Sequence, residues 1–208
     1  MYYSLDNYLF TFNTNDMKKL SEQQLLLIKK PLPKEAVAQH PTKGNLSTIK
    51  AIYVTERLND VFGVGAWKIK TDLVSPIMEK TKITNSGKER TEYTAILKTE
   101  FDVPEYGIYY ESIASSVNDD PGDACKGATT DAITKICSYI GIGIDVFKGQ
   151  HDSALQMYEN TQVAVFIDNI DKFTDKESLT NYAKGLDDNI KLNPVFRTAV
   201  SNKIKQLK

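Results

Sequence analysis

Apolar and polar residues alternate through much of the segment between Trp67 and Val117, and this alternation constrains the fold more than any other feature of the sequence. A period of two residues is typical of a strand with one buried face. Turn residues at 85–87 and 104–107 divide the segment, and short turns of this kind join antiparallel strands. We therefore expect an antiparallel β-meander with strands at residues 67–73, 77–84, 90–103 and 108–117.

Segments with a helical period flank these strands. A first helix is expected over residues 20–30, with Ser21 as its cap and two prolines after it. An irregular arm then leads to a second helix, which Ser47 or Thr48 can cap and which runs to about Phe62. The turn and cap residues after the strands open a third, long helix from about Ala124 to Ile140. Three more helical patterns follow, at residues 163–170, 176–186 and 194–207.

Together these patterns predict an α+β fold in which the antiparallel β-meander packs on the long helix, with a small helical domain at the C-terminus. The chain has 208 residues, of which 41% are hydrophobic, and this is ample for a packed core. We expect a core domain over residues 1–150, a linker over 151–161 and the helical domain over 162–208.

Composition excludes several classes of protein. We find no apolar run near the ~20 residues that a membrane span needs, and the N-terminal residues lack the cationic start of a signal peptide. Cys125 and Cys137 are the two cysteines, too few for a disulfide framework. We therefore expect a globular protein of the cytoplasm that does not bind membranes.

Catalytic chemistry has little support in the sequence. His40 and His151 lie in the arm and the linker without an obvious nucleophile beside them, and we expect both to be exposed. The cysteines are explained as small packing residues. Gly141 and Gly143 follow a helix, whereas a phosphate-binding loop precedes one. We expect no catalytic residue, no metal site and no cofactor.

Charge is unevenly distributed, although 26 basic residues nearly balance 27 acidic ones. Residues 18–50 hold seven lysines against two glutamates, and local charge decides what a surface attracts. Lys68 and Lys70 project from one face of the first strand, and Lys50 and Arg57 lie along the edge of the helix before it. Such a cationic stripe can follow the phosphates of a nucleic acid without reading its bases. The alternative is that these side chains only solvate an exposed face.

Two blocks of sequence stand on either side of the meander. They are residues 47–67, STIKAIYVTERLNDVFGVGAW, and residues 122–149, GDACKGATTDAITKICSYIGIGIDVFKG. Together they resemble the Rad52 family, and more closely its phage branch of single-strand annealing proteins, the Sak type. With the meander between them, the resemblance covers about residues 20–150. It implies a ββ-β-α core that assembles side by side into rings or helical filaments, with single-stranded DNA in a basic groove around the outside.

The resemblance also points to individual residues. Vertebrate members carry a basic cluster where this chain has Thr134, Lys135 and Ser138, so that one cation of the cluster is retained. Lys50 can replace an arginine that those members have at the position of Tyr53. Lys126 is about 180° from Lys135 around the long helix, and can instead serve a subunit contact. The full set of expected DNA-binding residues is Lys43, Lys50, Arg57, Lys68, Lys70, Lys126, Lys135 and Lys148.

The function that the resemblance implies is annealing without ATP in homologous recombination and DNA repair. The expected partners are single-stranded DNA, further copies of the chain and, through the C-terminal helices, a single-strand-binding protein. The compartment would be the host cell cytoplasm if a phage encodes the protein. Two alternatives stay open: a nucleic-acid enzyme such as a nuclease, and a structural oligomer with a solvated basic face.

Overall fold

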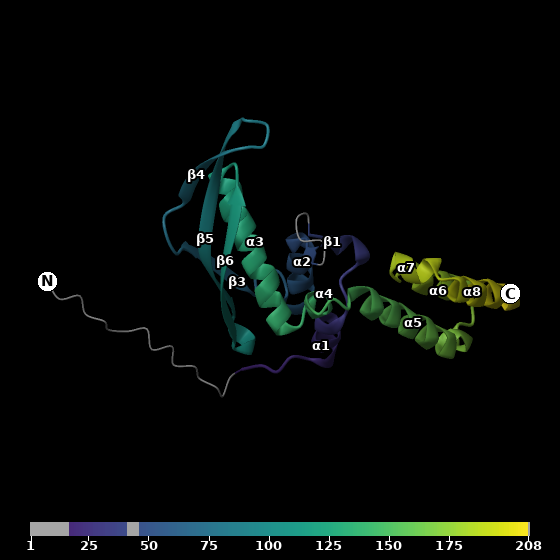
Figure 1. Ribbon diagram of the computed structural model, residues 1–208. Helices are drawn as coiled ribbons and strands as arrows, with labels where there is room; N and C mark the ends of the chain where they lie inside the picture. The colour runs from purple at the N-terminus through teal and green to yellow at the C-terminus, as the bar shows by residue number, and fades with distance from the viewer. Residues whose placement is uncertain (1–16, 41–45, 208) are drawn as a thin grey trace.

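The computed structural model describes residues 17–40 and 46–207, and Figure 1 shows how their elements are arranged. A sheet lies at one side of the molecule, and a long helix runs along one of its faces. The helices after residue 150 extend away from the sheet. The expected α+β class is confirmed.

The sheet is built around one long strand, β5 (Glu89–Val103). β6 (Ile108–Asn118) pairs with one edge of β5, and β3 (Lys68–Leu73) and β4 (Met78–Ile83) pair with successive parts of the other edge. All three pairings are antiparallel. Residues 74–77 form a bulge opposite residues 95–96, so β3 and β4 together make one bent edge strand. The antiparallel meander is therefore confirmed.

α3 (Pro121–Ile140) packs on β5 and β6 because its small residues let the sheet come close. Ala124, Ala128 and Ala132 recur every four residues and are fully buried. A Cβ atom on Gly127 would collide with the side chain of Ser116 in β6. The helix therefore lies against the sheet at a distance that larger side chains would prevent.

Both ends of α3 are set by local chemistry. The Asp120 carboxylate accepts a hydrogen bond from the N–H of Asp123 at 2.9 Å, which caps the helix and starts it at Pro121, earlier than the expected Ala124. Gly141 ends the helix with a φ of 117°, a conformation that favours glycine.

The expectation of a half-buried strand at residues 67–73 is wrong for β3. All of its residues are exposed. Ile69 and Leu73 stand opposite Phe101 and Leu97, whose side chains are buried on the face that α3 covers. They are exposed because α3 packs mainly on β5 and β6, and this apolar edge of the face is left uncovered.

α1 (Glu22–Lys29) and α2 (Ala51–Phe62) pack against each other and complete the main core. Ser21 caps α1 as expected: its Oγ accepts from the N–H of Gln24 at 3.2 Å, and the Gln24 side chain accepts from the N–H of Ser21 at 2.9 Å. The centre of this core is fully buried and consists of Leu32, Ala36, Val54, Leu58, Val103, Ile136, Cys137 and Ile142.

The arm between α1 and α2 is more regular than expected. A short 3-10 helix (Lys34–Ala36) leads into β1 (Val37–Gln39), which pairs antiparallel with β2 (Ser47–Ile49). Ser47 and Thr48 therefore lie in a strand, and neither caps α2. The N–H of Lys50 donates to the carbonyl oxygen of Ala36 at 2.8 Å, which keeps the chain extended up to the first turn of α2.

The C-terminal helices enclose a second apolar cluster around Phe166. The three expected helices are confirmed, and the elements are α4 (Ile144–Phe147), α5 (His151–Asn169), α6 (Lys176–Lys184), α7 (Asp188–Leu192) and α8 (Pro194–Gln206). The ring of Phe166 contacts the rings of Phe173, Tyr182 and Phe196. Within residues 17–40 and 46–207, no helix combines the length and the apolar character that crossing a bilayer requires.

Residues 151–161, expected as an irregular linker, are the first part of α5. The segment looked like a linker because it is mostly polar, and this part of α5 has little apolar surface to bury. Val165 and Ile167 of α5 and Val195 of α8 are exposed although they are apolar. The division into a core domain and a C-terminal domain stays a prediction.

Arg57 is buried, whereas it was expected beside Lys50 along the edge of α2. Its Nη1 donates to the carbonyl oxygens of Leu27 and Lys30, both at 2.6 Å. The last carbonyls of a helix have no partner within it, so a buried helix end needs donors from elsewhere. Burial lowers the pKa of the guanidinium, which is still charged at neutral pH. Arg57 thus ties the end of α1 to α2.

We predict that Arg57→Met lowers the free energy of unfolding by about 3 kcal/mol, because it leaves buried carbonyl groups unsatisfied. Urea unfolding followed by circular dichroism measures this change. Lys50→Met, at the exposed start of the same helix, is the control and should stay within about 0.5 kcal/mol of the parent. Equal stability of the two variants would contradict the structural role of Arg57.

Candidate nucleic-acid interface

Lys135 lies between two exposed aromatic rings. Its Nζ is 4.9 Å from the centre of the Phe147 ring and 5.4 Å from that of Tyr139. Tyr110 extends the group, with its ring centroid 5.8 Å from that of Tyr139. We call these four residues the Lys135 cluster. The exposed fractions of Tyr139, Phe147 and Tyr110 are 51%, 49% and 36%, so the rings are open to a ligand.

Three elements bring the Lys135 cluster together. Its lysine and Tyr139 are one helical turn apart on the same side of α3. Gly141 and Gly143 then adopt φ values of 117° and 66°, which turns the chain back and lets α4 place Phe147 beside α3. β6 supplies Tyr110, which stands opposite Phe101 on the face of the sheet that α3 covers. The site therefore depends on the packing of α3 against β6.

The cluster offers both kinds of contact that proteins make with unpaired nucleic acid. An ammonium group attracts phosphate, and an exposed ring stacks on a base with a contribution of about 1–3 kcal/mol. Within the described part of the chain, Lys135 forms no ion pair with a carboxylate. Its charge is therefore available, and the two rings hold it in place by cation–π attraction.

Two other expected residues lie on elements next to α4. Lys148 is the C-terminal cap residue of α4, and Lys50 directly follows β2, which contacts α4. Both are exposed, and neither pairs with a carboxylate of residues 17–40 or 46–207. α4 and its neighbours thus carry three lysines without a carboxylate partner: Lys50, Lys135 and Lys148.

Lys68 and Lys70 belong to a different surface, the face of the sheet turned away from α3. Acidic residues of the neighbouring strand β5 stand opposite both lysines on this face. Lys68 is opposite Asp102, and Lys70 is opposite Glu100. The Nζ of Lys70 is also 2.7 Å from Asp72, and this hydrogen bond raises the pKa of the lysine. A polyanion approaching this face would meet both signs of charge.

The expected cationic stripe from Lys50 and Arg57 to Lys68 and Lys70 is therefore not formed. Arg57 faces the core, and the length of α2, about 18 Å for its 12 residues, separates Lys50 from β3. Lys126 is exposed on the first half of α3, with its Nζ 3.9 Å from Asp123. It is about 180° from Lys135 around the helix. Lys43 lies outside the described residues.

The aromatic members of the Lys135 cluster were missed in the sequence because no spacing rule relates Tyr110, Tyr139 and Phe147. Tyr139 four residues after Lys135 was the one available signal, since residues at this spacing share a helix face. The ring of Tyr110 comes from a strand almost thirty residues earlier in the chain. Only the packing of α3 on β6 makes it a neighbour.

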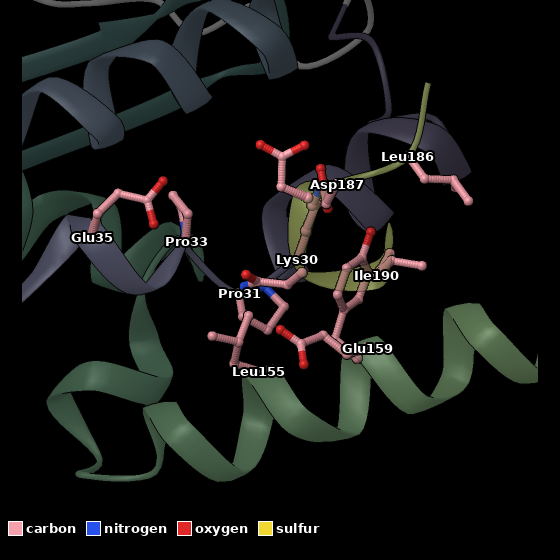
Figure 2. Close-up of a pocket in the computed structure, with 12 residues that line it drawn as sticks. Lys30, Pro31, Pro33, Glu35, Leu155, Glu159, Leu186, Asp187 and Ile190 are labelled. Atoms are coloured by element: carbon pink, nitrogen blue, oxygen red, sulfur yellow. The ribbon is translucent and has the colours of Figure 1, made fainter. Parts of the chain in front are cut away.

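The cavity beside Lys30 does not suit a polyanion. This cavity of about 420 Å³ lies between the end of α1, the arm, α5 and α7, and Figure 2 shows the residues that line it. Lys30 lines it together with Glu35, Glu159, Asp187 and Asp188, so the charged residues of its wall are mainly acidic. The Nζ of Lys30 is 2.8 Å from Asp187, which joins the core to the C-terminal helices. This cavity is a junction between the two apolar clusters.

Two of the residues considered for catalysis, His151 and Cys137, are buried, whereas His40 and Cys125 are half-buried. His151 was expected to be exposed but is buried at the start of α5, where its Nδ1 is 2.5 Å from Asp145 of α4. Cys137 is fully buried, and burial raises the pKa of its thiol to about 12, so it is not a nucleophile at neutral pH. In the part of the chain that the structure describes, no three His, Cys, Asp or Glu side chains are grouped as a metal site requires.

Comparison with known families agrees with this architecture. The family model described as "Rad52/22 family double-strand break repair protein" matches residues 19–163. The match includes both sequence blocks and all four residues of the Lys135 cluster, and it confirms the resemblance to Rad52, while the phage Sak branch stays a prediction. No curated protein matches the chain. Since the match spans well over half of the sequence, this chain belongs to the Rad52/22 family of double-strand break repair proteins.

Proposed function

We propose that this protein anneals complementary DNA strands without ATP during recombination, and that it binds single-stranded DNA at the Lys135 cluster. One observation carries the proposal: an unpaired lysine is held between exposed aromatic rings. Lys50 and Lys148 are proposed as additional phosphate contacts because they lie next to α4. Lys68, Lys70 and Lys126 lie on other surfaces and are not needed for it.

The mechanism follows from how each group contacts the strand. Lys135 neutralises a phosphate and releases counterions, so the affinity falls as salt rises. The rings of Tyr139, Phe147 and Tyr110 stack on the faces of bases, and contacts of this kind accept any sequence. Stacking leaves the hydrogen-bonding edges of the bases free. A complementary strand can then pair, since the repulsion between the two polyanions has been reduced and no covalent bond has to be made or broken.

We also propose that several copies assemble side by side, as a ring or a helical filament. Ile69 and Leu73 are 38% and 50% exposed on a face that is buried farther along the sheet. They lie on an edge strand, whose unpaired backbone groups and apolar side chains invite a second chain. Assembly would align many Lys135 clusters along one strand, and multivalency would convert weak contacts into firm binding. A single-strand-binding protein as partner of the C-terminal helices stays a prediction.

The direct test mixes two complementary oligonucleotides, one with a fluorophore and one with a quencher, in buffer with EDTA and without ATP. We expect the protein to accelerate duplex formation. Dependence on ATP or a divalent metal, or cleavage of the strands, would favour a nucleic-acid enzyme. Failure to bind single strands would favour a structural oligomer.

We predict that Lys135→Ala weakens binding to a labelled poly-dT oligonucleotide by about tenfold and lowers the slope of log affinity against log salt by about 0.7 per site, because one phosphate contact is lost. Tyr139→Ala should weaken binding to a similar degree, about tenfold, with the slope unchanged, because it removes stacking and no charge. Fluorescence anisotropy over a salt series measures both quantities.

Lys126→Ala is the matched control for Lys135→Ala, since it removes the same charge from the opposite side of α3 and should leave affinity and slope unchanged. If Lys126→Ala weakens binding and Lys135→Ala does not, the strand follows the other side of the helix and the proposed site is wrong.

We predict that the double variant Ile69→Lys and Leu73→Lys reduces the assembly to smaller species, because it places charges in the apolar edge that a second copy would cover. Multi-angle light scattering, with and without oligonucleotide, measures the mass. Val165→Lys is the control, because Val165 is a similarly exposed apolar residue on α5. A parent protein that is monomeric at every concentration would refute the assembly.

A further inference from the structure

Helix α8 carries two parallel rows of side chains of different character. Phe196, Val200 and Ile204 form an apolar row, and Arg197, Ser201 and Lys205 form a polar row beside it, each with a spacing of four residues. These six residues line an open groove of about 390 Å³. Phe196 is buried in the C-terminal cluster, and Val200 and Ile204 are half-buried against it and form the floor of the groove. The basic residues beside them are exposed. We call this surface the α8 groove.

The charged residues that line the α8 groove, Arg197 and Lys205, are both basic. The tail as a whole is balanced, but the sequence after Asp188 holds five basic residues and no acidic one. Lys191 and Lys203 are neutralised locally, since their Nζ atoms are 3.0 Å from Asp188 and 2.9 Å from Asp171. Arg197 and Lys205, the two cations of the groove, form no ion pair with a carboxylate that the structure describes.

Arg197 is also held in position. Its Nε donates to the carbonyl oxygen of Lys191 at 2.9 Å, so the end of the guanidinium remains for a ligand. Arg197 and Lys205 are eight residues apart, which is about 12 Å along a helix. An extended peptide covers this distance with about four residues, at roughly 3.3 Å each.

We propose that the α8 groove binds a short acidic peptide segment of a partner protein, with alternating apolar side chains that lie on the floor. Charge complementarity carries the proposal: the two unpaired cations flank an aliphatic surface with no acid on the same helix. Carboxylates of the peptide pair with Arg197 and Lys205, and its apolar side chains cover Val200 and Ile204. DNA fits less well, because the one aromatic ring of the groove, Phe196, is only 4% exposed and cannot stack on a base.

This inference goes beyond the proposed function and does not depend on the Lys135 cluster, which lies on other elements. The test uses the full chain and a fluorescein-labelled octapeptide of alternating Asp and Leu, followed by anisotropy. We expect saturable binding that weakens with salt. Two matched octapeptides separate the contributions of apolar contact and of charge to the affinity. A peptide of alternating Asp and Ser lacks the apolar side chains, and a peptide of alternating Lys and Leu has the opposite charge. Both should bind about tenfold more weakly or not at all.

The matched variants are Arg197→Glu with Lys205→Glu in the α8 groove, and Lys176→Glu with Lys184→Glu on α6. Both pairs reverse two exposed charges eight residues apart, so they change the net charge equally. The first pair should weaken binding of the Asp-Leu peptide by about tenfold or more, and the second pair should leave it unchanged. Circular dichroism checks that both variants keep their helix content.

Poly-dT binding distinguishes this inference from the proposed function. The α8 pair should leave poly-dT affinity unchanged, and Lys135→Ala should leave peptide affinity unchanged. The proposal that the α8 groove binds an acidic peptide is wrong if both charge-reversal pairs weaken peptide binding equally. It is also wrong if the Asp-Leu and Asp-Ser peptides bind equally well. If the α8 pair weakens poly-dT binding and leaves the affinity for the Asp-Leu peptide unchanged, the surface is a nucleic-acid contact and the inference is wrong.

Discussion

The close contact between α3 and the strands β5 and β6 is the interaction on which the rest of the structure depends. Ala124, Ala128 and Ala132 are fully buried in it, and their small size sets the distance between helix and sheet. Because the helix lies so close, Tyr139 reaches Tyr110 of β6, whereas the turn at Gly141 and Gly143 brings Phe147 to Lys135. The same contact leaves Ile69 and Leu73 of β3 uncovered, so the proposed binding site and the proposed assembly edge have one structural origin.

The surfaces of this protein differ in whether their lysines are paired with carboxylates, more than in how many lysines they carry. The outward face of the sheet is rich in lysine, but hydrogen bonds to Glu111 and Glu100 raise the pKa of Lys98, and Lys70 is bound to Asp72. The lysines around α4 have no such partners in the described structure. A net charge of −1 for the whole chain is therefore compatible with a local site for a polyanion, because screening limits each field to about 8–10 Å.

Much of the fold could be predicted from local patterns. The alternation of residues 90–103 predicted β5, and the glycine at position 87 predicted the hairpin before it. Ser21 was correctly predicted as the cap of α1. Predictions failed where a residue acts through a distant partner. Arg57 has the position of an edge residue in its own helix, but the free carbonyls of α1 draw it into the core. Residues 151–161 are too polar to show a helical period, although the helix continues through them.

The sequence by itself determined the class of the fold, the C-terminal ends of α2 and α3, the antiparallel meander and the resemblance to Rad52. Each of these depends on neighbours within a few residues or on contiguous blocks of sequence. The tertiary structure alone decided which cations are available. Lys135, Lys70 and Arg57 are all basic residues in amphipathic segments, yet one lies between aromatic rings, one is paired with a carboxylate and one is buried. The physical reason is that a charge is neutralised by whatever lies within a few ångströms in space, and this neighbour is set by how helices pack on the sheet.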